Sequence, residues 1–485
     1  MMRIRLTLAA VITTTLVAAC GGGGGGSAVA SAPVPVGGID RSGQSVGVVT
    51  GFGSVFVNGI EFDTRQATIT KNGQSATERD LKIGQIVTVD GTRNDARTTG
   101  VAKAIAYRSN VEGPVTAVNL GLKQLMVLGQ TVQVDNATVF EGVTPADVAG
   151  VTVNDNVEVS GLAGANGVIL ATHIEKRAAP ATLELRGVVS GVDTTAKRFS
   201  IGGQLIDYAN ATLVSFTNGA VNNGDHVEVR GATPATNAPL QATRVEKEAG
   251  SPAGSSGAHS ELEGLVTRFV SPSDFDVAGQ KVIANASTKY EEGTAADIKL
   301  GARAQVEGTV DANGALVADT MQVKAVSNTR VAGTVTLIDS GKKQLTVLGQ
   351  IVAVDAATQF EDKSRANKVP FAFADLATND FVEVRGVPGI GGVNILATRV
   401  ERQDAGAGGT QEVRGEVASI DAANFMFVVS GVTVTVDPAA RLKDRDGRTV
   451  TRAAFFVLLR VNDEIRANGT SNGAKALTAT EAELR

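Results

Sequence analysis

Residues with reactive side chains are few in this chain, which has 485 residues but only 3 His and 1 Cys. His173, His226 and His259 lie far apart in the sequence, so no His/Cys cluster with the spacing of a zinc site is present. Ser340 and Lys343 match the Ser-x-x-Lys pattern, but they fall in a predicted turn, whereas that nucleophile needs a helix start and further partners. The sequence also lacks a phosphate loop. We therefore predict no catalytic residues and no cofactor, and we expect the histidines to be structural.

Aspartates at recurring positions could instead bind a metal. Asp135, Asp355 and Asp437 each follow a valine-containing strand pattern, and carboxylate oxygens are ligands for Ca²⁺. One carboxylate per repeat, however, falls short of the roughly six to eight oxygens that this ion takes. Because Asp is also a favoured turn residue, we expect these three residues to form turns and predict no metal site.

The densest aromatic group, Phe52, Phe56 and Phe62, allows two interpretations. Exposed rings could form a ligand platform, since stacking on an aromatic side chain stabilises a bound base by roughly 1–3 kcal/mol. Val55 and Val57 alternate with Phe56, however, so both faces of this strand could be buried in the core or between domains. Core or inter-barrel packing is the favoured interpretation, and the ligand platform of Phe52, Phe56 and Phe62 is the alternative, a candidate binding site. A second aromatic group comprises Phe199, Tyr208 and Phe216.

The N-terminal residues carry a targeting pattern. Arg3 and Arg5 precede the apolar stretch Leu6–Ala19, a charged segment and a short apolar segment that are typical of a signal peptide. At 1.5 Å per residue this stretch spans about 21 Å, too short for a hydrocarbon core of about 30 Å. Its last residues, Val-Ala-Ala-Cys, resemble the lipobox of bacterial lipoproteins, which implies cleavage after Ala19 and lipid modification of Cys20. Ordinary secretory cleavage, which would leave a free thiol, is the alternative.

Residues 20–40 are expected to form the lipidated cysteine and a flexible tether. Residues 21–26 are consecutive glycines, a composition that cannot bury a core. In the lipoprotein family the residue after the cysteine directs sorting, and Gly21 implies the outer membrane. We therefore predict that residues 1–19 are removed and that the protein is anchored in the outer membrane through its N-terminal lipid, with its face of the membrane undetermined. No later stretch reaches about 18 apolar residues, so no transmembrane helix is predicted.

One motif order recurs six times in the rest of the chain. Each copy opens with a glycine in a valine-rich run: Gly47, Gly113, Gly187, Gly264, Gly333 and Gly415. Their spacings of 66, 74, 77, 69 and 82 residues exceed the period of a solenoid, so each copy can close its own barrel. We predict repeats at 41–108, 109–178, 183–248, 261–326, 327–403 and 411–485. Barrels this small are marginal alone, so neighbours should pack together, except across a predicted linker at 249–260.

Copy two illustrates the predicted fold. Alternating polar and apolar residues predict strands at 111–118, 124–128, 131–135, 157–161 and 168–175. Leu128-Gly129-Gln130 is a predicted hairpin turn, a further glycine ends the fourth run, and residues 144–147 begin a short helical element. Five strands with such an element before the fourth resemble an OB-like barrel. The predicted class is all-β, a tandem array of about six small five-stranded OB-like β-barrels after a lipoprotein signal peptide and flexible tether.

Two sequence segments carry a further resemblance. Gly51–Gly59 (GFGSVFVNG) and Leu81–Gln85 (LKIGQ), with the later Val-Glu-Val-Arg-Gly runs, resemble tandem domains of unknown function (DUF 5666) in bacterial surface lipoproteins. The resemblance covers nearly all of residues 41–485 and implies an envelope location, but no substrate, activity or catalytic residue. Copy six departs most, because Phe455–Leu459 replaces the short helix and Asp463–Gly469 replaces the usual Val-x-Val-x-Gly, which leaves its closure open.

Charge and location narrow the function. Lys+Arg 45 against Asp+Glu 50 gives a net charge of -5, and no basic run is present, so we expect no nucleic-acid partner. The leading hypothesis is a non-enzymatic outer-membrane lipoprotein whose barrels bind or scaffold an envelope protein or glycan. The alternatives are an envelope enzyme or accessory subunit with an unrecognised site, and a structural spacer.

Overall fold

The computed structural model describes residues 41–94, 96–179, 182–232, 238–248, 253–324, 329–356, 358–389, 391–405 and 410–485. These residues all belong to one unit, Gly38–Arg485. The predicted signal peptide, Ala19, Cys20 and the tether lie outside the described residues. Within the described part of the chain, no helix combines the length and the apolar character that crossing a membrane would require.

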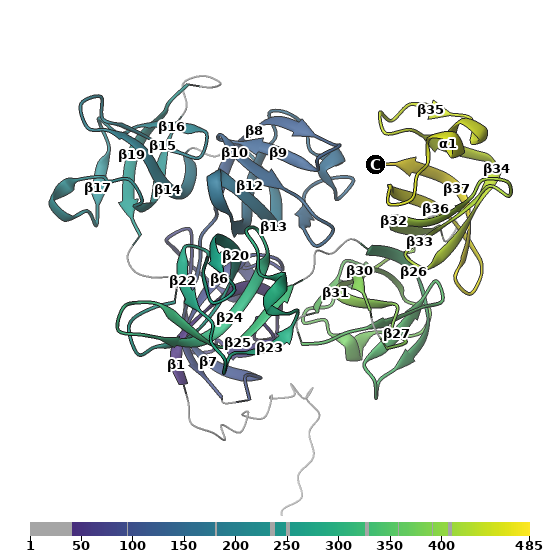
Figure 1. Cartoon of the computed structure of the whole chain (residues 1–485), viewed down its shortest axis with the longest axis horizontal. Coiled ribbons are helices and arrows are strands. Elements are labelled where there is room, and N and C mark those ends of the chain that lie inside the picture. The colour runs from purple at the N-terminus through teal and green to yellow at the C-terminus, as the bar shows by residue number, and fades with distance from the viewer. Residues whose placement is uncertain are drawn as a thin grey trace, which may run out of the picture. The chain divides into compact units, whose positions relative to one another are not determined.

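The alternating sequence pattern forms strands in all six copies (Figure 1). Copy one comprises β1 (Arg41–Gly51), β2 (Val55–Val57), β3 (Ile60–Asp63), β4 (Thr68–Lys71), β5 (Gln74–Ala76), β6 (Ile86–Arg93) and β7 (Thr99–Tyr107). Copy two comprises β8 (Val111–Asn119), β9 (Gln124–Val127), β10 (Gln130–Gln133), β11 (Val139–Glu141), β12 (Asn156–Ala163) and β13 (Val168–Arg177). Copy three comprises β14 (Leu183–Asp193), β15 (Arg198–Ile201), β16 (Gln204–Asp207), β17 (Thr212–Val214), β18 (His226–Ala232) and β19 (Leu240–Lys247).

The C-terminal half repeats the same order. Copy four comprises β20 (His259–Ser271), β21 (Asp274–Val277), β22 (Gln280–Ile283), β23 (Lys289–Glu292), β24 (Arg303–Val310) and β25 (Leu316–Lys324). Copy five comprises β26 (Thr329–Asp339), β27 (Gln344–Val347), β28 (Gln350–Ala353), β29 (Gln359–Asp362), β30 (Phe381–Pro388) and β31 (Ile395–Gln403). Copy six comprises β32 (Gln411–Asp421), β33 (Met426–Val429), β34 (Val432–Lys443), β35 (Thr449–Val450), α1 (Arg452–Leu458), β36 (Glu464–Gly473) and β37 (Ala476–Leu484). Short 3₁₀ helices lie at Glu78–Asp80, Val148–Gly150, Ala165–Gly167, Thr217–Gly219, Ala295–Asp297 and Phe373–Asp375.

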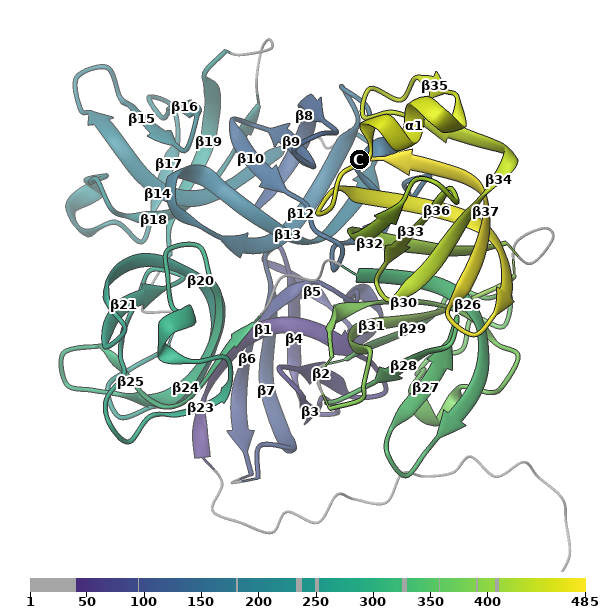
Figure 2. The same ribbon diagram turned by 45° about the vertical axis from the view of Figure 1, so that its right-hand side comes forward.

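Strand pairing in copy two closes a five-stranded barrel. β8 pairs with β9, β9 with β10, β10 in parallel with β13, β13 with β12, and β12 with β8 again. Figure 2 shows the closed ring most clearly for copy four, around β20, β24 and β25. This order confirms the predicted OB-like barrel. The short β11 was not predicted; it adds to the barrel by pairing in parallel with β13.

The hairpin between the second and third strands follows the predicted turn. Leu128 and Gly129 have φ of 43° and 67°, and Asn58 and Gly59 have φ of 55° and 82°. Two consecutive positive φ angles in a two-residue loop are those of a type I′ turn, whose twist matches that of the flanking strands. The hairpin prediction at Leu128-Gly129-Gln130 is therefore confirmed.

The third recurring glycine has a different role from the one predicted. The register of β12 against β13 shifts between Ser160 and Gly161, and β12 continues beyond this point. In copy one a Cβ at the matching Gly91 would lie 2.2 Å from the carbonyl oxygen of Val101. The glycine therefore permits a β-bulge inside the strand and does not end it.

Copy six closes like the others. β32 pairs with β33 and β36, and β37 pairs with β34 and β36. Phe455 and Phe456 form the buried face of α1 itself. The sequence pattern instead indicates that their segment replaces the helix. Thr451 begins this helix, because its side chain accepts a hydrogen bond from the backbone N–H of Ala454 at 3.3 Å.

First strands also join barrels in pairs. β8 pairs with β14 and β26 with β32, both antiparallel, so copies two and three share one sheet and copies five and six share another. β1 instead pairs in parallel with β20 of copy four. The expectation that neighbours pack is confirmed for copies two and three and for copies five and six, whereas copy one pairs with a copy distant in sequence.

Part of the predicted linker belongs to copy four. Residues 249–252 lie outside the described residues, but Ala253 is fully buried in the core of copy four. The Ser260 hydroxyl donates a hydrogen bond to the carbonyl oxygen of Ala253 at 2.5 Å. His259 and Ser260 begin β20, so the fourth barrel starts earlier than predicted.

Candidate functional site

A pocket of about 520 Å³ opens where copies one, two and five meet. We call it the three-barrel pocket. Its apolar floor consists of buried side chains from all three copies: Leu81 and Ile83 precede β6, Val139 lies on β11, and Phe371 follows β29. The volume is within the range of small-molecule binding sites, roughly 300–1,000 Å³.

Close backbone approaches hold the three barrels around this pocket. A Cβ at Gly84 of copy one would lie 2.6 Å from the carbonyl oxygen of Thr172 and 3.2 Å from Cβ of Val139, both in copy two. A Cβ at Gly53 would lie 2.9 Å from Pro370 of copy five. Any larger residue at these two glycines would separate the barrels, so the pocket depends on them.

One wall of the pocket is an insertion in copy five. Residues 363–372 separate β29 from the following 3₁₀ helix, whereas in copy four residues 293–294 fill the same gap. The insertion supplies Lys363, Asn367, Lys368, Val369 and Phe371 to the lining. The repeat fold thus provides the scaffold, and copy five adds a segment that shapes the site.

The insertion is held by a buried carboxylate at its start. Asp362 accepts hydrogen bonds from Nε of Arg402 at 3.0 Å, from the Ser364 hydroxyl at 2.6 Å and from the backbone N–H of Lys368 at 2.7 Å. These donors, Arg402 first among them, hold the pKa of Asp362 well below its usual range. The guanidinium of Arg402 also lies 4.6 Å from the ring centroid of Phe371.

A cluster of Lys82, Glu141 and His173 lies on the side formed by copies one and two. Nζ of Lys82 donates to Oε1 of Glu141 at 2.9 Å, and Nε2 of His173 lies 3.5 Å from Oε2 of Glu141. The imidazole of His173 is fully buried. Contact with His173, and after it the bond from Lys82, lowers the pKa of Glu141 to about 2. This carboxylate is therefore ionised at neutral pH and bound by its own neighbours.

The three phenylalanines of the predicted platform do not share one face. Phe62 is 1% exposed and lies in the core of copy one beside Val55 and Val57. Phe56 is half-buried on β2, where its ring lies next to Gly51, outside the three-barrel pocket. Phe52 lies in the turn after β1 and lines the pocket. Of the three predicted platform residues, only Phe52 lines the three-barrel pocket. The sequence pattern placed the platform in copy one alone, whereas the pocket is formed by three copies.

The other residues noted in the sequence have structural surroundings. Phe199 and Tyr208 are buried with ring centroids 5.4 Å apart, and Phe216 packs against the same core. Asp135 accepts the backbone N–H of Ala137 at 2.8 Å, which confirms its turn-forming role. Asp437 accepts that of Ala439 at 2.8 Å, but it lies at an irregularity within β34 and not in a turn between strands.

The other two histidines, His226 and His259, lie in different surroundings. His226 is exposed at the start of β18. His259 is buried, and its Nε2 lies 2.9 Å from Oε1 of Glu307. Within the described residues, no three His, Cys, Asp or Glu side chains are placed to share a metal ion.

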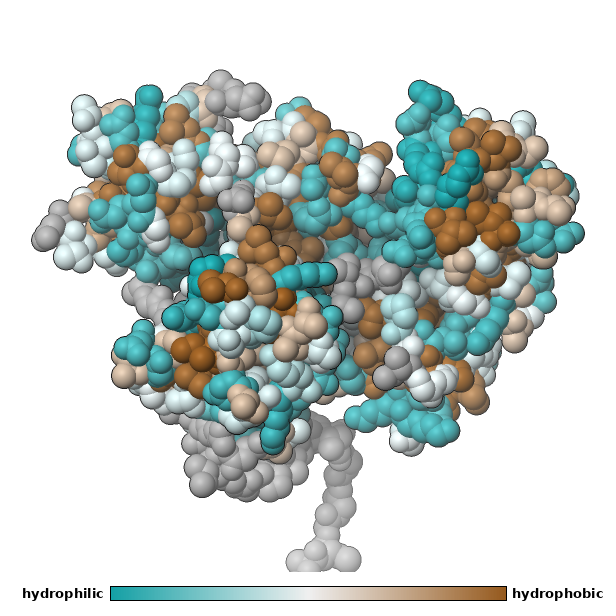
Figure 3. All heavy atoms as spheres, viewed as in Figure 1, coloured by the Kyte–Doolittle hydropathy of each residue, from teal (hydrophilic) through white to brown (hydrophobic). Residues whose placement is uncertain are grey.

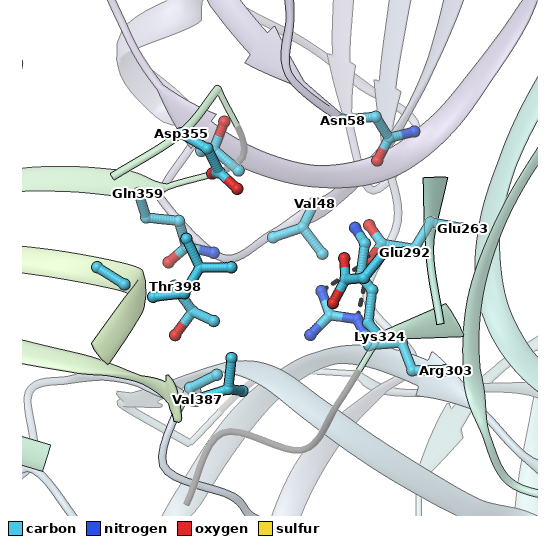
Figure 4. Close-up of a pocket in the computed structure, with 14 residues that line it drawn as sticks. Val48, Asn58, Glu263, Glu292, Arg303, Lys324, Asp355, Gln359, Val387 and Thr398 are labelled. Carbon is cyan, nitrogen blue, oxygen red and sulfur yellow. Dashed lines mark hydrogen bonds and ion pairs between the residues drawn. The ribbon is translucent and has the colours of Figure 1, made fainter. Parts of the chain in front are cut away.

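A second, smaller cavity lies among copies one, two, four and five (Figure 4). Its volume is about 80 Å³, room for a few water molecules. Figure 4 shows Glu263, Arg303 and Lys324 gathered on one side. Nε of Arg303 and Nζ of Lys324 each donate to Glu263 at 2.8 Å. Although burial raises it, these two cations lower the pKa of Glu263 to about 2, so this cluster is a satisfied structural one.

Exposed apolar side chains are dispersed over the surface. Figure 3 shows polar and apolar residues interspersed on one face of the molecule. Leu120 and Leu122 are exposed in the β8–β9 turn of copy two, Val270 near the end of β20 in copy four, and Leu337 near the end of β26 in copy five. The three-barrel pocket, which combines depth with aromatic and charged groups, is therefore the strongest candidate site.

Each copy is a small closed β-barrel, and the chain is a tandem array of six such barrels. The sequence model of a family described as "Domain of unknown function (DUF5666)" matches residues 46–106, 112–175, 186–246, 263–322, 332–401 and 414–483. These matches cover most of the sequence, so the chain belongs to this family.

Other comparisons add little. No curated protein matches this chain. A solved structure titled "drosophila Unr CSD456" is similar at 14% sequence identity over 45% of this chain and 98% of that one, with a TM-score of 0.13. A TM-score this low supports no conclusion about the fold or function of this chain.

The sequence pattern missed the insertion at residues 363–372. The one available signal was the spacing of 82 residues between Gly333 and Gly415, the largest of the five. Length alone, however, does not show that the extra residues face copies one and two.

Proposed function

We propose that this chain is a lipid-anchored binding or scaffold protein of the bacterial outer membrane and that the three-barrel pocket is its binding site. The observation that carries the proposal is the pocket itself: about 520 Å³, built jointly by three repeats, with an insertion that only copy five contributes to it. An envelope protein or glycan is the proposed partner. A pocket formed between repeats also gives a reason for their tandem arrangement.

The lining favours binding over catalysis. It contains no Ser, Thr, Cys or Tyr side chain among the described residues. Glu141 accepts from Lys82, and Asp362 accepts from Arg402, so these carboxylates are held ionised and engaged. A general acid or base needs a pKa near the working pH, which such partners oppose.

The anchor is proposed from the lipobox at the N-terminus. Lipid on Cys20 would hold the barrels at the membrane, since each buried methylene contributes about 0.8 kcal/mol. Metabolic labelling with palmitate should mark the wild-type chain and should be absent from Cys20→Ala. Labelling that persists in this variant would contradict the anchor.

The binding site is tested by narrowing the pocket. Val369 lines it and is 71% exposed, so Val369→Trp adds bulk without disturbing a core. Wild-type protein immobilised on beads should retain a specific protein or glycan from envelope extract, and Val369→Trp should lose it. Val270→Trp is the matched control, because Val270 is 64% exposed on a hairpin of copy four outside the pocket. Equal retention by all three proteins would place the binding site elsewhere.

A further inference from the structure

The carboxylates that line the three-barrel pocket already have hydrogen-bond donors. Glu78 accepts from the Thr64 hydroxyl at 2.6 Å and from the backbone N–H of Gly53 at 3.3 Å. Glu141 accepts from Lys82 at 2.9 Å. These acceptors need nothing from a ligand, and a cationic ligand would have to displace the groups that hold them.

The carboxylates on the side formed by copy five also have hydrogen-bond donors. Glu361 accepts a short hydrogen bond from the guanidinium of Arg399, which is itself almost fully buried. Asp362 has no exposed side-chain surface and accepts from Arg402 at 3.0 Å. All four carboxylates of the lining thus accept hydrogen bonds from other groups of this chain.

Donors, in contrast, remain available at the mouth of the pocket. Arg79 is exposed and has no hydrogen-bond or ion-pair partner among the described residues. Lys363 is also exposed, and its Nζ lies 3.6 Å from Glu361 and 3.7 Å from Glu401, distances beyond a good hydrogen bond. A guanidinium and an ammonium together offer several N–H donors to an anion, the guanidinium in a planar fork that suits a carboxylate.

Apolar surface lies next to these donors. Phe52 and Phe360 are half-buried rings in the lining, and Phe371 and Ile83 form part of the floor. Phe360 is fixed by an edge contact with Phe373, with ring centroids 6.4 Å apart and planes at 73°. A fixed ring presents its face to a flat apolar partner at low entropic cost.

We infer that the three-barrel pocket binds an anionic ligand that has an apolar ring face, with Arg79 and Lys363 contacting the anion and the phenylalanines contacting the ring. The inference rests on the proposed function and names the chemistry of its ligand. A sugar acid and an aromatic carboxylic acid share this chemistry. One titration series can distinguish these two classes of ligand.

Isothermal titration of the full chain with two matched pairs tests the inference. The pairs are glucuronate with glucose and 2-naphthoate with 2-naphthamide. At least one acid should bind, and its neutral partner should bind roughly 10-fold more weakly, since hydrogen bonds to an ionised acceptor are stronger than those to a neutral one. Preference for glucuronate identifies the sugar-acid source, and preference for 2-naphthoate identifies the aromatic one.

Variants assign the binding to the named donors. Arg79→Gln and Lys363→Gln should each weaken binding of the preferred acid by roughly 3- to 10-fold, with the neutral partner unaffected. Arg365→Gln is the matched control: it removes the same charge from the same insertion, but Arg365 is outside the lining and pairs with Asp404. Arg79, Lys363 and Arg365 are exposed, so these changes leave the fold intact.

The outcomes separate the inference from the proposed function. Equal binding of an acid and its neutral partner, lost in Val369→Trp but unchanged in Arg79→Gln, would overturn the anion inference and leave the pocket as a binding site. Failure of both acids to bind would also overturn it, while the retention experiment with Val369→Trp decides the proposed function independently.

Discussion

Two strand seams join neighbouring barrels in the same register, yet they carry opposite charges. We call the pairing of β8 with β14 the acid seam, where Glu112 faces Glu184 and Val111 faces Leu185. We call the pairing of β26 with β32 the arginine seam, where Arg330 faces Arg414 and Ala332 faces Glu412. Counted from the first-strand glycines, Ala332 is equivalent to Glu112, and Glu412 to Glu184. Asn110 is likewise equivalent to Arg330, so two substituted positions change the electrostatics of joints that share one register.

The apolar part of both joints is alike. The buried residues of copies two and three form one continuous core, and so do those of copies five and six. Copies one and four, joined by the parallel pairing of β1 with β20, keep separate cores. Apolar packing therefore stabilises both antiparallel seams, and the charged residues decide how each seam responds to substitution and pH.

The charged groups of the arginine seam form ion pairs with one another and with neighbouring strands. Arg330 donates to Glu383 at 2.6 Å and lies 3.2 Å from Glu412. Arg414 donates to Glu464 at 2.9 Å and to Asp147 of copy two at 2.8 Å. This seam therefore also connects to a third barrel. Buried polar atoms without a hydrogen-bond partner occur in both seams, namely Oε1 of Glu184 in the acid seam, and Nε of Arg330 and Oε1 of Glu412 in the arginine seam.

The largest effect is expected from removing Arg414. Arg414→Ala would leave Glu464 and Asp147 partly buried without their shared cation, and Arg414 itself is only 3% exposed. Breaking a buried pair typically costs about 3–5 kcal/mol, and we expect roughly 3 kcal/mol here because Arg485 still contacts Asp147 at 3.0 Å. Scanning calorimetry should show a lower melting temperature for the transition of copies five and six.

The matched variant in the acid seam is Arg186→Ala. Arg186 occupies the equivalent position before Gly187, donates to Glu248 at 2.5 Å, and its side chain is 25% exposed. Solvent screens this pair, so we expect a loss of about 1 kcal/mol. An equal or larger loss for Arg186→Ala would contradict the contrast between the two seams.

The next effect is the pH dependence of stability that Glu184 gives to the acid seam. Burial first, and then the charge of Glu228, raises the pKa of Glu184 to about 8. The stability that its neutral form contributes is complete below the ordinary pKa of 4.5 and is lost as the pH rises through about 8. Glu184→Gln, which cannot ionise, should therefore gain about 1–2 kcal/mol over wild type at pH 8.5 and little at pH 4.5.

The arginine seam should respond in the opposite direction. Although burial raises it, Arg385 and Arg330 hold the pKa of Glu383 well below its usual range. Its contribution is present above the ordinary carboxylate pKa and is lost as the pH falls. Melting curves of wild type from about pH 2.5 to about pH 9 should show the transition of copies two and three moving down at alkaline pH and that of copies five and six moving down below the ordinary carboxylate pKa of 4.5. Parallel movement of both transitions would contradict this assignment.

The repeat architecture could be predicted because it follows from local patterns. Asn58-Gly59 and Leu128-Gly129 specify their turns by backbone geometry alone, and alternation specifies the strands. The bulge at Gly161 was mistaken for a strand end, because a glycine permits either and the choice depends on pairing with β13. Local sequence thus determines each barrel but not every irregularity within it.

The arrangement of the barrels could not be predicted in the same way. All six first strands share one apolar pattern, so nothing local distinguishes the antiparallel pairing of β8 with β14 from the parallel pairing of β1 with β20. The pocket could not be predicted for the same reason, since Phe52 and Phe360 are far apart in sequence and line one pocket only through barrel packing. A site formed between repeats is therefore hidden from any pattern that recurs within each repeat.

The smallest effect is expected from a substitution that makes the acid seam more like the arginine seam. Glu112→Ala places in the acid seam the residue that the arginine seam has at Ala332. Glu112 contributes to the raised pKa of Glu184, after burial and Glu228, so its removal should lower that pKa by less than about one unit. Stability at pH 8.5 should rise by roughly 0.5 kcal/mol, and the alkaline fall in melting temperature should be smaller in Glu112→Ala than in wild type.

Two controls decide whether the facing carboxylates cause this effect. Glu112→Gln keeps the size of the side chain and should reproduce the gain of Glu112→Ala at pH 8.5. In Glu184→Gln, where the facing carboxylate is already absent, adding Glu112→Ala should give a smaller gain than it gives alone, since interacting residues are not additive. Full additivity would mean that Glu112 acts on its own surroundings, which include Glu158, and that the acid pair across β8 and β14 is not what distinguishes the two seams.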